Sequence, residues 1–587
     1  MLCTYRYSYK LHSNGNLVVQ IIMGELNRLD VVLCWHMHQP EYRVAGQSAE
    51  PWTYLHALKD YADMAAHLEA IPEARAVVNF TPILLRQLAR DAREITSHLA
   101  AGDALTEPLL AALASVPSDA SARAKLVQSC LAVNERTMLG RWPAFAALAV
   151  LVRPAANEPT LARYLNDACI ADLCVWFHLA WFGEARRRQD PLLQRLIAAG
   201  GDFTMQDRRA LLMLIGAEIN DIVPRYRALL EAGRIELSLT PWGHPILPLL
   251  IDITAGQETL PDGPLPEASE YPGGHQRARW HIDHAINEFA DQFGVRPIGC
   301  WPSEGAISRA TLELLEETDF AWTASGAGVL GNAEIVRDST DDCAHMSYSL
   351  ADHNLRCFFR DDGLSDLIGF TYQSWEAPRA VDDLISHLEN IQRLCPSSSA
   401  IVPIILDGEN AWEHYPENGF DFLRILYQRL ADHPQLHLTT FAEHLTRNPR
   451  ASATLTSVKA GSWVYGTLST WIGNDPRNRA WDLLVHAKQA FDACIDASND
   501  ASNDASNDGH VNRVQLEEML GVCEGSDWFW WLSEHQSASA VARFESLYRQ
   551  HLTALYRALD VRVPNELAVV LGAGDAHATA ASMQRSS

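Results

Sequence analysis

Two acidic residues follow apolar segments that are typical of buried strands. Glu304 comes shortly after the segment Pro297–Trp301, and Asp407 comes directly after Ala400–Leu406, the most hydrophobic segment of the chain. Glycoside hydrolysis needs two carboxyl groups at one bond, one to donate a proton and one that is ionised. Burial would raise the pKa of Asp407 and suit it to donate a proton. Taken alone, each residue is as readily interpreted as the cap of a following helix.

Further polar residues lie at predicted strand ends. Glu409 follows Asp407 by two positions, so on an extended backbone both face the same side. Glu409 can share a proton, bind sugar hydroxyl groups, hold a metal or face solvent. His36 and His38 also share one side of a strand end. They can start a Zn²⁺ or Fe²⁺ site, bind sugar hydroxyl groups together with Gln39, or pack as structural residues.

A stiff loop carries another candidate. His244 lies in the segment Pro241–Pro245, after a predicted strand, and prolines on both sides restrict the backbone. This arrangement suits a side chain that must be held in position, although a rigid turn needed only for folding explains it almost as well.

Four tryptophans adjoin these polar residues, and we expect them to help bind a substrate: Trp242, Trp301, Trp412 and Trp471. An indole ring combines a flat apolar face with an N–H donor, so Trp412 and Trp471 are candidates for stacking on sugar rings. The segment Trp528–Trp531 is so hydrophobic that we expect some of its tryptophans to be core.

Several strands must position these residues. The apolar pattern predicts strands at Leu29–Trp35, Arg75–Phe80, Arg234–Thr240, Pro297–Trp301, Asn354–Phe359 and Ala400–Leu406. Amphipathic helices follow some of them, as in a parallel α/β sheet. Polar and aromatic clusters stand at the carboxyl ends of these strands, where the active sites of α/β barrels lie.

Composition limits the class of protein. The chain has 587 residues, too many for one compact core. Its net charge of −26 weighs against binding to nucleic acid or to anionic membranes. We find neither a signal peptide in residues 1–22 nor an apolar run of membrane-spanning length. Several of the 11 cysteines lie in apolar runs, which predicts buried reduced thiols and a cytoplasmic location: Cys34, Cys300 and Cys357.

Pattern and composition divide the chain into four predicted regions: an extension without predicted structure at 1–26, a catalytic domain at 27–450, a mainly helical region at 451–567 that completes the active site, and a flexible tail at 568–587. Met23 is an alternative start. A helical insertion is expected around 100–200. Three copies of Ala-Ser-Asn-Asp at 497–508 predict a disordered surface loop.

Five segments resemble, in order, the five sequence regions of glycoside hydrolase family 57, in particular its amylases, amylopullulanases and related α-glucan-active enzymes: His36–Pro40, Trp242–Leu250, Gly299–Glu304, Leu406–Trp412, and Ser469–Gly473 with Asn478–Trp481. The resemblance spans Val31 to Trp531. Each region alone is a weak signal, but five in sequence are hard to obtain by chance.

The resemblance implies an α/β fold, an incomplete barrel of seven β/α units followed by a mainly helical C-terminal region. It implies that Glu304 is the nucleophile and Asp407 the acid/base of a retaining mechanism, without a metal or other cofactor. The implied substrate is an α-glucan such as starch, glycogen or maltodextrin, cleaved at α-1,4 or α-1,6 bonds. Nucleic acid and membrane are not expected partners, and the oligomeric state stays open.

Three alternatives remain at this point. A 4-α-glucanotransferase would use the same two carboxylates. A metal-dependent polysaccharide deacetylase would use His36, His38 and an acid such as Asp407 as ligands, but it would leave Glu304 without a role. A glycan-binding protein without catalytic activity would not need both acids.

Overall fold

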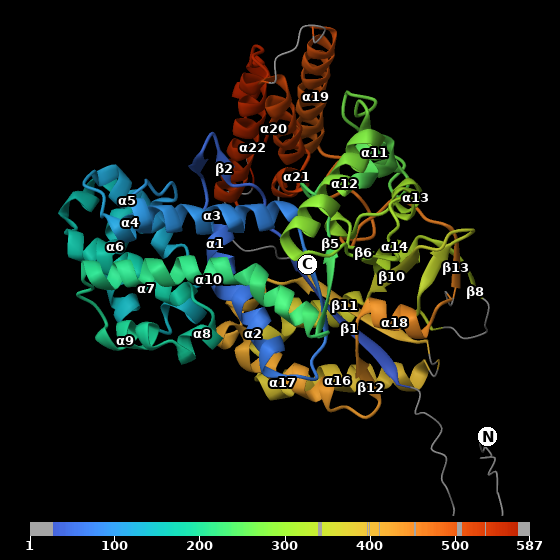
Figure 1. Ribbon diagram of the computed structural model, residues 1–587, viewed down its shortest axis with the longest axis horizontal. Coiled ribbons are helices and arrows are strands. Elements are labelled where there is room, and N and C mark those ends of the chain that lie inside the picture. The colour runs from blue at the N-terminus through green and yellow to red at the C-terminus, as the bar shows by residue number, and fades with distance from the viewer. Residues whose placement is uncertain are drawn as a thin grey trace, which may run out of the picture.

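The computed structural model describes residues 28–572 and 574, except for 338–342, 396, 398, 410, 451–452, 502–507 and 534–535. Strands occupy the centre, a group of helices extends to one side, and the C-terminal helices stand on top (Figure 1). The predicted extension 1–26 and most of the predicted tail lie outside the described residues. Within the described part of the chain, no helix is long and apolar enough to cross a membrane.

A large parallel sheet forms the centre of this mixed α/β fold. Within the described residues, seven strands pair in parallel in the order β11–β1–β4–β5–β6–β7–β10. Their bounds are Ile401–Asp407 for β11, Leu29–Met37 for β1, Ala76–Phe80 for β4, Ile235–Leu239 for β5, Gly299–Cys300 for β6, Trp322–Gly326 for β7 and Arg356–Arg360 for β10. The apolar pattern predicts six of these strands and misses β7.

The register of the strands brings distant residues to one edge of the sheet. His36 in β1 lies opposite Asp407 in β11 on one side and opposite Asn79 in β4 on the other. The loop that carries His244 follows β5, and the turn that carries Glu304 follows β6. Because parallel strands end at the same edge, these residues collect there.

The sheet continues beyond β10 with shorter strands. β9 (Tyr348–Leu350) pairs antiparallel with β10, β13 (Ala453–Ser457) pairs parallel with β9, and β8 (Glu334–Arg337) pairs antiparallel with β13. β12 (Leu436–Leu438) pairs with β1. β13 lies past residue 450, so the sheet extends into the region that was expected to be helical.

The helical insertion forms the group at one side of Figure 1. It lies between α3 (Pro82–Ala101) and α10 (Met205–Glu231), which pack against each other. The predicted insertion consists of α4 (Pro108–Ala114), α5 (Ala120–Leu131), α6 (Pro143–Asn157), α7 (Asp167–Trp181), α8 (Glu184–Gln189) and α9 (Pro191–Ala199).

The C-terminal helices pack together above the sheet (Figure 1). They are α19 (Asp475–Ala501), α20 (Asp508–Cys523), α21 (Asp527–Trp531) and α22 (Ala538–Ala558). α19 continues through residues 497–501, so the start of the predicted disordered loop is helical, as an extension of a helix that packs on α20 and α22. Residues 502–507 of that loop lie outside the described residues.

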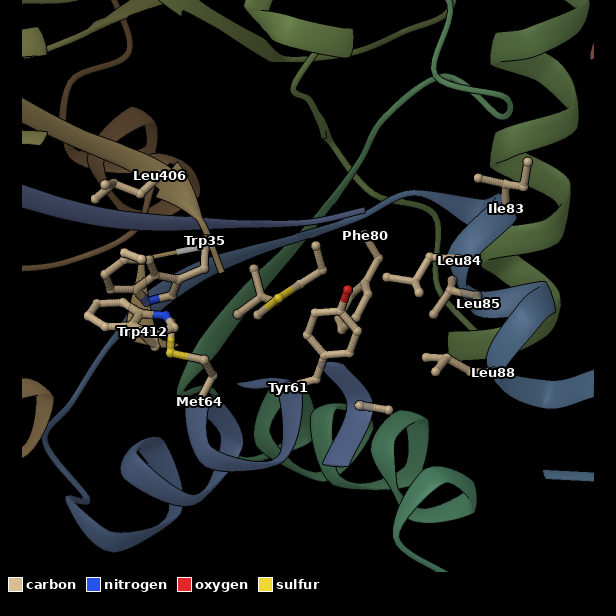
Figure 2. Close-up of a cluster of buried hydrophobic side chains, with 14 of the residues drawn as sticks. Trp35, Tyr61, Met64, Phe80, Ile83, Leu84, Leu85, Leu88, Leu406 and Trp412 are labelled. Atoms are coloured by element: carbon tan, nitrogen blue, oxygen red, sulfur yellow. The ribbon is translucent and has the colours of Figure 1, made fainter. Parts of the chain in front are cut away.

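A core of aromatic and aliphatic side chains lies below the strand ends (Figure 2). The ring of Trp35 packs edge-on against the ring of Trp412, with 5.8 Å between the ring centroids. The indole N–H of Trp35 donates to the hydroxyl of Tyr427 at 2.7 Å. The indole N–H of Trp412 donates to the carbonyl of Gly408 at 2.9 Å. Trp412 therefore holds the turn that follows Asp407 from the core side.

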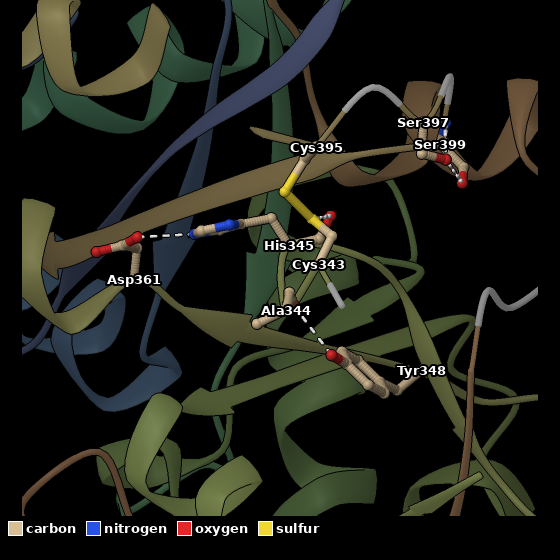
Figure 3. Close-up of a disulfide and its surroundings, with 8 residues drawn as sticks. All are labelled: Cys343, Ala344, His345, Tyr348, Asp361, Cys395, Ser397 and Ser399. Atoms are coloured by element: carbon tan, nitrogen blue, oxygen red, sulfur yellow. Dashed lines mark hydrogen bonds and ion pairs between the residues drawn. A yellow bond between two sulfur atoms is a disulfide. The ribbon is translucent and has the colours of Figure 1, made fainter. Parts of the chain in front are cut away.

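Cys343 and Cys395 form a disulfide bond (Figure 3). It joins the segment before β9 to the residue after α16 (Ala377–Leu394). Neither cysteine is one of those predicted to be a buried reduced thiol, but a disulfide bond removes the support that the thiols gave to a cytoplasmic location. The cysteines named in the sequence analysis are free and buried, as predicted: Cys34, Cys300 and Cys357.

Candidate active site

Glu304 lies in a tight turn after β6. Its backbone has a φ of 58°, which is uncommon for a residue other than glycine, and Gly305 has a φ of 56°. A Cβ at Gly305 would lie 2.7 Å from the ring of Trp301, so only glycine fits there. On the other side, Trp463 donates its backbone N–H to the carbonyl of Glu304 at 3.1 Å and its indole N–H to Oε2 at 2.8 Å. The carboxyl group is thus held in one place.

The electrostatic environment of Glu304 links it to two other acids. Burial is the largest cause that raises the pKa of Glu304, to about 8, and the charge of Asp407 is the next. The hydrogen bond from Trp463 opposes this rise, and the charge of Asp527 adds to it. The charges of two other acids, Asp407 and Asp527, therefore favour the protonated form of Glu304.

His36 and His244 form a buried pair of imidazoles. Their Nε2 atoms lie 3.2 Å apart, Nδ1 of His36 lies 2.7 Å from Oδ1 of Asn79, and Nδ1 of His244 lies 2.7 Å from the hydroxyl of Ser526. Burial, and secondly the neighbouring histidines, lower the pKa of His36 to about 3 and that of His244 well below its usual value. Both rings are therefore neutral at neutral pH.

His38 is paired with an acid from the C-terminal helices. Its Nε2 lies 3.0 Å from both carboxylate oxygens of Asp527, and its Nδ1 lies 3.0 Å from the hydroxyl of Thr81. The ring stacks on His244 with 3.8 Å between centroids. Asp527 is a candidate that sequence reasoning missed. Its one local signal is its place before the aromatic run Trp528–Trp531, which by itself indicates core.

The loop after β5 is where the C-terminal helices reach the site. Gly525 forms an isolated antiparallel bridge with Pro245, and the N–H of Ser526 donates to the carbonyl of His244 at 2.8 Å. His244 has a φ of 60°, so its stiff loop is also strained. These contacts place the start of α21 beside the histidines.

Glu409 is buried at the same edge. Its Oε1 accepts a hydrogen bond from the side-chain amide of Gln39 at 3.1 Å and a long one from the backbone N–H of His38 at 3.4 Å. Its Oε2 has no hydrogen-bond partner among the described residues. Burial, and secondly the charges of Asp407 and Asp60, raise its pKa well above the usual value. Burial therefore favours the neutral form of Glu409, and its side chain does not face solvent.

The four tryptophans expected to bind substrate are at most 2% exposed: Trp242, Trp301, Trp412 and Trp471. None of them presents an open ring face in this structure, so the stacking predicted for Trp412 and Trp471 has no exposed ring to support it. Other aromatic rings cover them instead. Trp242 packs on Trp280 at 5.6 Å, and Trp301 packs on Trp463 at 5.2 Å. Trp301 and Trp412 contact the turns that carry Glu304 and follow Asp407, respectively.

The described residues include one group at this edge that could hold a metal ion, formed by His38, His244 and Asp527. It differs from the set of His36, His38 and Asp407 considered for a deacetylase. Each ring nitrogen of His38 and His244 already has a protein partner within 3.2 Å. The group is therefore satisfied as a hydrogen-bond network.

Comparisons with solved structures agree with this fold. A family 57 branching enzyme from Thermococcus kodakaraensis is 15% identical, with 91% of this chain and 90% of that chain covered and a TM-score of 0.56. A family 57 branching enzyme from Pyrococcus horikoshii is 14% identical, with 91% of this chain and 95% of that chain covered and a TM-score of 0.57. An α-amylase from Thermotoga maritima is 13% identical, with 92% of this chain and 95% of that chain covered and a TM-score of 0.55.

A comparison with curated protein sequences found no match. The sequence profile of glycosyl hydrolase family 57, by contrast, matches residues 32–455, which is most of the chain and includes both Glu304 and Asp407. The match contains four of the five sequence regions, and the fifth, Ser469–Gly473 with Asn478–Trp481, lies beyond it. The resemblance to the family is confirmed, and the chain belongs to glycosyl hydrolase family 57.

Proposed function

We propose that the protein is a retaining glycoside hydrolase of α-glucans, with Glu304 as nucleophile and Asp407 as general acid/base. The observation that carries this proposal is the coupling of two carboxyl groups at one edge of a parallel sheet, in a chain of this family. The α-amylase and branching-enzyme activities named for the structural neighbours support an α-glucan as substrate. A protein that only binds glycans would not need this pair.

Each carboxyl group has a defined task in this mechanism. Glu304 attacks the anomeric carbon while Asp407 gives its proton to the glycosidic oxygen, so that bond breaks and a glycosyl ester forms. Asp407 then takes a proton from the acceptor hydroxyl, which attacks the same carbon and releases Glu304. Because the pKa of Glu304 is about 8, the free protein keeps a proton on the pair. The productive form carries that proton on Asp407.

The remaining polar residues bind sugar hydroxyl groups. When substrate binds, the hydrogen bond between His36 and His244 breaks, and each neutral ring binds a sugar hydroxyl instead. This is possible because a neutral imidazole has one donor and one acceptor nitrogen. Oε2 of Glu409, which has no hydrogen-bond partner among the described residues, binds a hydroxyl in the same space. Gln39 and the pair of His38 with Asp527 complete this set.

We also infer that the sheet is an incomplete barrel of seven β/α units. Two hydrogen bonds show that the ends of β10 and β11 lie close together. The backbone N–H of Asp361 donates to the carbonyl of Pro403 at 2.8 Å, and the guanidinium of Arg360 donates to the carbonyl of Ile405 at 2.7 Å. No β-ladder joins these two strands within the described residues.

Replacement of either acid tests the proposal. We expect Glu304→Gln and Asp407→Asn each to lower turnover of starch or maltooligosaccharides by at least about a thousandfold, because the nucleophile or the proton donor is lost. Glu313→Gln, on the surface of α13 (Arg309–Glu317), is the matched control. Thermal unfolding shows that the variants are folded. Near-normal turnover in either active-site variant would end the assignment.

The transferase alternative differs only in the acceptor, which is a sugar hydroxyl instead of water. Chromatography of the products from maltopentaose separates the two. Shorter sugars alone mean hydrolysis, whereas longer products mean transfer.

A further inference from the structure

A cavity of about 350 Å³ opens beside the candidate active site. Four residues of the site line one side of it: His38, Gln39, Glu409 and Asp527. Glu304 lies close enough to this side to respond to the charge of Asp527. The volume falls in the range of about 300–1,000 Å³ that is usual for pockets of small ligands. The cavity therefore adjoins the polar residues of the site and is large enough for a further part of a bound chain.

Two half-buried tryptophans line the cavity. Trp531 ends α21, and one face of its ring is covered by Phe544 at 4.2 Å between centroids with an interplanar angle of 9°. Trp52 begins α1 (Trp52–His56) and packs against Trp181 at 5.9 Å. Unlike the fully buried tryptophans near the strand ends, both keep part of the ring exposed. An indole backed on one side and open on the other is a stacking surface for a sugar ring.

The insertion supplies a polar wall of the same cavity. Asn134 lies in the turn after α5, and its amide is 3.3 Å from Nδ1 of His414. Its Oδ1 accepts hydrogen bonds from the N–H groups of Arg136 and Thr137, at 3.1 Å each. The side chains of those two residues in turn donate to the carbonyls of His414 and Glu413. The insertion is thus fastened to the segment after β11, and Asn134 is held in place.

We propose that this cavity is a subsite for a further glucosyl unit of the α-glucan, and that Trp531, Trp52 and Asn134 determine how strongly chain length affects binding. The inference rests on the proposed function and extends it. Aromatic faces set against amide and imidazole groups recognise a neutral sugar, because the rings take its apolar face and the polar groups take its hydroxyls. The insertion thereby contributes directly to substrate selection.

Kinetics on maltooligosaccharides of two to seven glucose units test this subsite. We expect Trp531→Ala and Asn134→Ala to raise the KM for maltoheptaose by about tenfold, a typical loss for one stacking or hydrogen-bond partner, and to raise it less for the shortest substrate that is turned over. Trp531→Phe keeps a ring and restores most of the preference for long chains. The matched controls are Trp375→Ala, a half-buried tryptophan outside this cavity, and Asn157→Ala, an exposed residue of the same insertion.

Binding of maltoheptaose to Glu304→Gln, measured by titration calorimetry with and without Trp531→Ala, separates the subsite from catalysis. The subsite predicts weaker binding in the double variant. If the wild type turns over α-glucans but Trp531→Ala and Asn134→Ala change all chain lengths equally, or none, the subsite is refuted and the proposed function stands. If the wild type turns over no α-glucan, the proposed function is refuted, and the subsite with it.

Discussion

The tryptophans beside the strand ends and those that line the cavity differ in what surrounds their rings. Trp412 and Trp301 are at most 1% exposed and pack against the turn that follows Asp407 and the turn that carries Glu304, respectively. Trp531 and Trp52 come from helices outside the sheet and keep part of each ring exposed. A tryptophan next to a catalytic motif thus supports the backbone of the motif, whereas a tryptophan brought in by another segment is free to meet the substrate.

Trp463 shares features with both groups of tryptophans. It is half-buried, packs on Trp301 and donates to the carboxylate of Glu304. An indole can therefore act on the reacting group itself, through its N–H instead of its ring face. The following predictions separate these three uses of tryptophan, in order of the expected effect.

Removal of a supporting tryptophan should act on stability. Trp412→Ala is expected to lower the free energy of unfolding by about 3–5 kcal/mol, because a large ring leaves the core and a cavity remains. Trp531→Ala should cost less, since part of its ring is already exposed. Thermal unfolding of both variants beside the wild type gives the comparison. A Trp412→Ala protein of normal stability but raised KM would mean that this ring contacts substrate after all.

The pH dependence of kcat/KM should respond to the partners of Glu304. The productive form holds one proton on the pair of Glu304 and Asp407, so kcat/KM should fall as pH rises through the Glu304 pKa of about 8 and that proton is lost. Asp527→Asn removes a charge that raises this pKa and should move the fall to lower pH. Trp463→Phe removes a hydrogen bond that lowers this pKa and should move the fall to higher pH, and both shifts should be less than about one pH unit.

Trp375→Phe, which changes a tryptophan remote from Glu304, is the control for the pH profiles. Shifts of the Asp527→Asn and Trp463→Phe profiles in the same direction would contradict the electrostatic account of Glu304.

Most of the parallel sheet could be predicted because its strands are continuous apolar runs, such as Ile401–Asp407. β7 was not predicted, because Trp322–Gly326 consists mainly of Thr, Ala, Ser and Gly, small residues that also occur in loops. The strand ends then indicate Glu304, Asp407 and the histidines, since parallel strands share one edge.

Other parts of the site could not be predicted. Asp527 lies 489 positions from His38, and no local pattern connects residues so far apart. The burial of Trp412 and Trp471 could not be foreseen, because an indole has the same sequence signature in the core and on a sugar-binding surface. Burial depends on which segments pack against it, and those come from elsewhere in the chain.

The central claim is that Glu304 forms the covalent bond to the sugar. A 5-fluoro-glucosyl fluoride, which slows the release of such an intermediate, should label the protein once, and peptide mass spectrometry should locate the label on Glu304. A label on Asp407, Glu409 or Asp527 would contradict the account, because the attacking oxygen would then belong to a different side chain.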